Sequence, residues 1–104
     1  MKINDIIKFL VNMAINDENK YFDIVHAIAL IFPDKLVEQL NQIAQKPIWD
    51  GDIISPSYRN ELLDMKLAVK ICFKREQGYT SATNIAYSIL KIIDPPKAEE
   101  PSKG

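Results

Sequence analysis

Apolar residues recur at helical spacing in three stretches near the start of the chain. Residues 3–16 place six apolar side chains on one face, with Lys8 and Asn12 on the opposite face. Residues 20–32 are apolar around most of the circumference, and a third stretch reaches Gln45 with a clean apolar stripe. A spacing of three and four residues predicts three helices with faces that must be buried.

Turn-forming residues separate these three helices. The sequence Asn-Asp-Glu-Asn at 16–19 predicts a break, because Asn and Asp side chains can bond to their own backbone. Pro33 ends the second helix, since proline has no amide hydrogen and its ring clashes with the preceding turn. Pro33 also suits the first turn of the third helix, which Lys46 and Pro47 end.

The pattern changes in residues 48–93, which predict a short helix, a two-stranded hairpin and a closing helix. Ser55 can cap the short helix and Pro56 fits its first position, and the helix ends near Lys66. Before it, Ile48 and Trp49 form a small strand or a packed connector, and residues 50–52 form a turn. If residues 49–53 form a helical turn of their own, the irregular part of the connector between the third helix and the short helix is shorter.

Strict alternation marks the hairpin. Between Ala68 and Lys74, one face carries the apolar residues Val69, Ile71 and Phe73. The other face carries Lys70, Cys72 and Lys74. This is the pattern of a half-buried strand. Residues 75–78 predict the turn, with Gly78 where a positive φ is easiest. A return strand follows at 79–81, and Thr83 can cap the last helix, which ends before residues 94–96.

The composition is that of one soluble globular domain. The chain has 104 residues, of which 47% are hydrophobic and 26% charged, and no apolar run reaches the roughly 18 residues of a membrane span. The single cysteine and the absence of a secretory-signal pattern predict a cytoplasmic protein. We expect one domain over residues 1–94, divided into a helical part (1–45) and a second module (46–94). A disordered tail follows at 95–104.

Four short motifs follow one another in the second module: Arg59-Asn60-Glu61-Leu62, Met65-Lys66-Leu67-Ala68-Val69, Gly78-Tyr79 and Ala82-Thr83. Together they resemble the second half of a winged helix-turn-helix domain, in which a recognition helix runs into a hairpin called the wing. The resemblance covers residues 48–93. It implies a mainly α (α+β) fold and a small DNA-binding regulatory or accessory protein. Lys66 stands where that family often has glycine.

The short helix holds the residues that could read DNA. A recognition helix contacts bases through its N-terminal residues, which here are Ser57, Tyr58, Arg59 and Asn60. Arginine can read guanine and asparagine can read adenine, while Ser55 and Ser57 could bind phosphate at the helix start. Glu61 and Asp64 would repel phosphates unless they point away. The alternative is a solvated helix that only closes the core.

Basic residues of the hairpin are the second set of candidates. Lys74 and Arg75 at its tip, with Lys70 on the same strand face as Lys74, could contact phosphates of double-stranded DNA. Residues 46–93 carry seven basic and five acidic side chains, so this part has a net charge of +2 within a chain of net charge −1. Hairpin tips are also often charged simply to prevent edge pairing.

No pattern in the sequence predicts an enzyme. His26 is the only histidine, and Cys72 has no histidine predicted beside it to activate it. Asp50 and Asp52 flank a glycine but lack the other ligands of a calcium loop, so a turn is favoured. We therefore expect no catalytic residues, no cofactor and no metal.

The broad apolar faces of the first three helices suggest a second type of partner. They exceed what the small second module can cover, which predicts a homodimer through the N-terminal helices. The near-neutral charge keeps a second function open. This is a protein–protein interaction module without DNA binding, such as a phage or mobile-element protein that inhibits a host protein.

Overall fold

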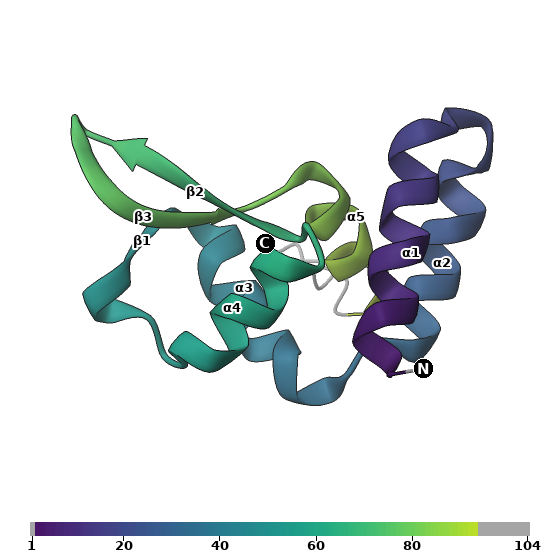
Figure 1. Cartoon of the computed structure of the whole chain (residues 1–104), viewed down its shortest axis with the longest axis horizontal. Coiled ribbons are helices and arrows are strands. Elements are labelled where there is room, and N and C mark those ends of the chain that lie inside the picture. The colour runs from purple at the N-terminus through teal and green to yellow at the C-terminus, as the bar shows by residue number, and fades with distance from the viewer. Residues whose placement is uncertain (1, 94–104) are drawn as a thin grey trace, which may run out of the picture.

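The computed structural model describes residues 2–93, except for the side chain of Phe73, and the predicted tail at 95–104 lies outside this range. The fold is mainly α-helical with a small antiparallel sheet, as the sequence predicts (Figure 1). The described helices are α1 (Ile3–Asn16), α2 (Tyr21–Ile31), α3 (Val37–Gln45), α4 (Pro56–Asp64) and α5 (Asn84–Ile93). The described strands are β1 (Ile48–Trp49), β2 (Ala68–Phe73) and β3 (Glu76–Ala82).

The helices share one apolar core. Helix α1 packs on α2, and both α2 and α3 pack on α5. The core runs through all five helices, and its largest fully buried apolar side chains are Ile7, Val11, Val25, Ile28, Leu36, Leu40, Ile43, Leu62, Met65, Leu67 and Ile89. The predicted helical and hairpin parts therefore fold onto each other through a common core.

The sheet carries the hairpin away from this core. Its order is β1-β3-β2 with antiparallel pairing throughout, and Ile48 and Lys70 both lie opposite Thr80. Helix α3 contacts β3 and α4 contacts β2. In Figure 1 the β2–β3 hairpin projects from the end of the molecule opposite to the α1–α2 pair. Its tip is therefore the part of the sheet farthest from the N-terminal helices.

The hairpin turn differs from the prediction. Lys74 and Arg75 occupy the turn, with φ of 53° and 68°, because Phe73 already pairs with Glu76. Gly78, with φ of 88°, lies inside β3 at the register shift between Ile71 and Phe73, where one additional residue must be accommodated. Glycine is therefore used for a bulge, and the return strand begins at Glu76.

The start of β2 turns the other face to the core than its alternation predicts. Val69 is 43% exposed, whereas Ala68, Thr80 and Ala82 on the other face are buried. Farther along the strand Ile71 is half-buried and Lys70 and Cys72 are exposed, so only the end of the hairpin near the core departs from the predicted pattern.

Both ends of α4 have defined caps. The hydroxyl of Ser55 accepts a hydrogen bond from the Tyr58 amide at 3.2 Å, as predicted for an N-cap. At the other end, the Leu67 amide donates to the Leu62 carbonyl and the Lys66 amide donates to the Leu63 carbonyl. This is a Schellman motif with Lys66 in the left-handed conformation, at φ of 65°. Lys66 stands where the winged helix-turn-helix family often has glycine, and its left-handed conformation is one that glycine adopts without strain.

The connector before α4 is partly helical. Residues 50–52 form a single 3-10 turn between β1 and α4, which gives the helical turn considered for this segment. The third predicted helix is likewise divided, since Asp34–Leu36 form a 3-10 turn before α3 begins.

Candidate nucleic-acid interface

One side of α4 and of its C-cap faces the core. Leu62 and Met65 are buried, and Tyr58 is partly buried against the core with the Lys35 ammonium 5.5 Å from its ring centre. Ser57 and Asn60 are exposed in the first turns of the helix. These two polar side chains are therefore the predicted α4 residues closest to solvent, although the Asn60 side-chain oxygen already accepts a hydrogen bond from Arg59 Nε at 3.2 Å.

Ser55 is already engaged in holding the connector. Besides the hydroxyl contact with Tyr58, its amide donates to Gln39 Oε1 at 2.8 Å. The Gln39 side chain is buried in α3, and its amide nitrogen donates to Gln42 at 2.7 Å. Ser55 thus positions the start of α4, and its hydroxyl is directed to the helix.

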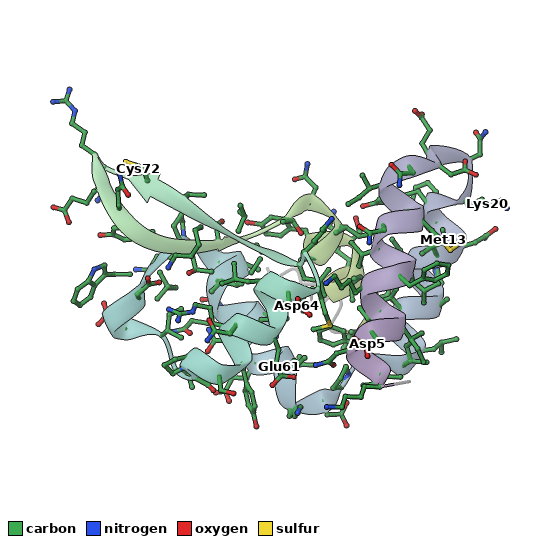
Figure 2. The ribbon with its side chains drawn as sticks, in the orientation of Figure 1. Asp5, Met13, Lys20, Glu61, Asp64 and Cys72 are labelled. Atoms are coloured by element: carbon green, nitrogen blue, oxygen red, sulfur yellow. The ribbon has the colours of Figure 1, made fainter. Side chains whose placement is uncertain are left out.

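The two acids of α4 are paired with residues that come before it in the chain. Asp64 lies 3.3 Å from the Lys8 ammonium, and Glu61 accepts a hydrogen bond from Asn4 at 2.7 Å and lies 3.7 Å from Lys35. Figure 2 shows Asp64 on the side of α4 that faces α1. These pairs compensate the negative charge that would otherwise repel phosphate.

Asp50 forms the centre of a polar cluster that joins three elements of the fold. Its carboxylate accepts a hydrogen bond from Thr80 at 3.1 Å and lies 3.1 Å from Arg59 Nη1. The Lys70 ammonium also contacts this carboxylate. Two of the predicted DNA-binding residues, Arg59 from α4 and Lys70 from β2, are thereby brought together on one acid.

The cluster lowers the pKa of Asp50 below its ordinary value of 3.8. Partial burial favours the neutral carboxyl, but the hydrogen bonds from Lys70 and Thr80 and the charges of Lys70 and Arg59 outweigh it. Asp50 is therefore ionised at neutral pH and compensates much of the positive charge beside it. The Arg59 side chain is 16% exposed, so it is poorly placed to reach a base edge.

Lys74 and Arg75 occupy a different environment. Both are exposed at the outermost turn of the hairpin, and both have a positive φ. A two-residue hairpin turn with two positive φ values is the type I′ pattern, which strongly favours Asn-Gly. For other residues the left-handed conformation costs about 1–2 kcal/mol each. The chain thus places two cations at a turn where stability alone would favour uncharged residues.

Sequence reasoning missed the roles of Asp50 and Thr80. Asp50 was interpreted as a turn residue and Thr80 only as part of a return strand. Their contacts depend on the pairing of β1 with β3 and of Lys70 with Thr80, which join residues far apart in the sequence. An acid shortly before a helix that contains a basic residue is the only local signal, and it is weak.

The other polar residues considered from the sequence form no recognisable centre. Among the described residues, no group of three His, Cys, Asp or Glu side chains could hold a metal ion. His26 is exposed with Nδ1 2.8 Å from the Phe22 carbonyl oxygen, and Cys72 is exposed on the hairpin (Figure 2). No helix within residues 2–93 is both long and apolar enough to cross a membrane.

Comparison with known proteins gives no match to a family model, to a curated protein or to a solved structure.

Proposed function

We propose that the protein is a small DNA-binding regulatory or accessory protein of winged-helix type, and that its hairpin tip contacts the phosphate backbone. The order α3, β1, a short helical turn, α4, β2 and β3 supports the resemblance seen in the sequence. So does the position of β1 beside β3 in the sheet.

The hairpin tip carries this proposal. Lys74 and Arg75 lie at the end of a projecting hairpin, in backbone conformations that disfavour their residue types. Residues retained at a conformational cost are concentrated at functional positions. Cations that extend from a projecting tip can approach a phosphate or a minor groove without interference from residues 1–45, which carry six acidic and four basic side chains.

Helix α4 has a supporting role in this arrangement. Ser57 and Asn60 are exposed at its N-terminal end, where a polar side chain or a backbone amide can contact a phosphate. Arg59 is held by Asp50 and contributes little to base reading in this conformation. We therefore propose binding that depends mainly on the backbone and only weakly on sequence.

The test is a fluorescence anisotropy titration of labelled duplex DNA. Two phosphate contacts give a slope of log K against log salt of about −1.8, or roughly tenfold weaker binding between 50 and 200 mM salt. The double variant Lys74→Ala, Arg75→Ala should lose this slope and most of the affinity. Absence of binding by the wild-type protein at low salt would refute the proposal.

Protein binding is a second candidate function, favoured by exposed apolar side chains on α2. Phe22 and Leu30 are 75% and 87% exposed, and with His26 they follow one face at a spacing of four residues. Large exposed apolar surfaces are typical of interaction sites. We propose a second copy of the chain as the occupant, because a two-fold axis near His26 would place Phe22 of one copy against Leu30 of the other.

Sedimentation and cross-linking test this dimer. In a Cys72→Ser background, His26→Cys should form a disulfide-linked dimer under mild oxidation, because the two copies of residue 26 would meet at the axis. Phe22→Ser with Leu30→Ser should give a monomer, whereas Phe9→Ser, which removes an exposed aromatic ring from α1, should not change the association. A wild-type protein that stays monomeric at high micromolar concentration would exclude the dimer.

A further inference from the structure

The side chains around Asp50 form the donor set of an anion site. Arg59 comes from α4, Lys70 from β2 and Thr80 from β3, and all three direct polar hydrogens to the same carboxylate. A guanidinium, an ammonium and a hydroxyl that converge on one point are also the groups that proteins use to bind phosphate. The carboxylate of Asp50 thus stands where a phosphate oxygen would be bound.

We propose that Arg59, Lys70 and Thr80 form a phosphate-binding site that Asp50 occupies as an internal competitor. For nucleic-acid phosphate this inference rests on the proposed DNA binding, whereas the site itself could also take free phosphate. When a phosphate displaces the Asp50 carboxylate, one anion takes the place of another. Arg59 and Lys70 therefore keep a negative partner throughout.

Burial explains why the site requires an anion. The Arg59 side chain is 16% exposed and Thr80 is fully buried, so neither can be well solvated by water alone. Removing the partner of a largely buried charge is costly, whereas exchanging it for another anion is not. The Thr80 hydroxyl donates to Asp50 and would equally donate to a phosphate oxygen.

Exposure explains how an outside phosphate could enter. The side chains of Asp50 and Lys70 are 33% and 43% exposed, so one side of the cluster faces solvent. Asp50 lies in the short 3-10 turn at residues 50–52, outside the five helices and the hairpin. Its carboxylate can therefore leave by a side-chain rotation without unpairing a strand.

The chain offers a matched control for testing this site. Asp50→Asn and Asp52→Asn each remove one negative charge from the same turn, so they change the general electrostatics equally. Asp52 is exposed and forms no ion pair within the described part of the chain. A difference between the two variants therefore reports the release of Arg59 and Lys70.

The first measurement is duplex DNA affinity as a function of salt. Asp50→Asn should bind more tightly than Asp52→Asn, with a salt slope steeper by about 0.9 for each additional phosphate that the released cations neutralise. Adding Arg59→Gln and Lys70→Gln to Asp50→Asn should remove this increase in affinity. If the two single variants have equal DNA affinities and equal salt slopes while the wild type still binds DNA, the proposal that Asp50 occupies a phosphate-binding site is overturned. The proposed DNA binding then still stands.

The second measurement uses inorganic phosphate and NMR, so it does not depend on DNA binding. In Asp50→Asn, phosphate should cause saturable shifts at Arg59 and Thr80, and in Asp52→Asn it should not. Phosphate shifts without tighter DNA binding would assign the site to free phosphate, and no saturable shifts in Asp50→Asn would overturn it. If Asp50→Asn is poorly folded, the same comparison is made with Lys66→Gly present in both variants, since that change is expected to stabilise the fold.

Discussion

Replacement of the hairpin turn by Asn-Gly should stabilise the protein and weaken DNA binding at the same time. Lys74 and Arg75 are held at φ of 53° and 68°, where a side chain beyond Cα crowds the backbone. Asn tolerates this conformation and Gly adopts it freely, so the variant Lys74→Asn, Arg75→Gly keeps the turn and relieves its strain.

The size of the stabilisation follows from the two backbone conformations. A left-handed residue costs about 1–2 kcal/mol, and glycine recovers most of this at position 75 but loses roughly 0.5–1 kcal/mol through its freedom in the unfolded chain. Asn recovers part of the cost at position 74. The net stabilisation is about 1 kcal/mol, which raises Tm by about 4–8 °C in a domain of this size.

Thermal unfolding followed by circular dichroism gives the first readout, and duplex DNA titration gives the second. The variant Lys74→Ala, Arg75→Ala is the matched control, because it removes the same charges but keeps residues with a Cβ at both positions. In both variants the slope of log K against log salt for DNA binding should become less steep by about 1.8. Only the Asn-Gly variant should become more stable. An Asn-Gly variant with unchanged or lower Tm would refute the strain argument.

Three further predictions concern the fold around the site. Lys66→Gly should stabilise the protein by about 0.5–1 kcal/mol in urea unfolding, because glycine adopts the left-handed conformation at the end of α4 without strain. Gln39→Leu should lose about 1–3 kcal/mol in the same assay, because the Ser55 amide loses its acceptor. The folded-state pKa of Asp50 is below its ordinary value, so its contribution to stability is complete above that value and is lost as pH falls through the folded pKa. Asp50→Asn should therefore be less stable than the wild type at neutral pH, with a difference that shrinks in acid.

Local patterns in the sequence predicted the elements well. The first two helices and the Ser55 cap follow from spacing and capping chemistry that act within a few residues. The mainly α fold with a small antiparallel sheet follows from the same signals.

The details that depend on distant pairing were not predictable in this way. The hairpin turn was expected near Gly78 because glycine is the usual residue at a positive φ, yet Lys74 and Arg75 take that position. Asp50 could not be recognised as a partner of Arg59, since the 3-10 turn at residues 50–52 and α4 bring the two side chains together only in the folded chain. Only the folded chain shows that Arg59 and Lys70 share Asp50, whereas Lys74 and Arg75 lie at the hairpin turn.

The central claim is that DNA meets the hairpin tip, and an NMR titration of the wild-type protein with duplex DNA at low salt tests it most directly. Binding through the tip should give the largest amide shifts at the turn of Lys74 and Arg75, with smaller ones at Ser57 and Asn60. No shifts, or shifts confined to α1 and α2, would contradict it.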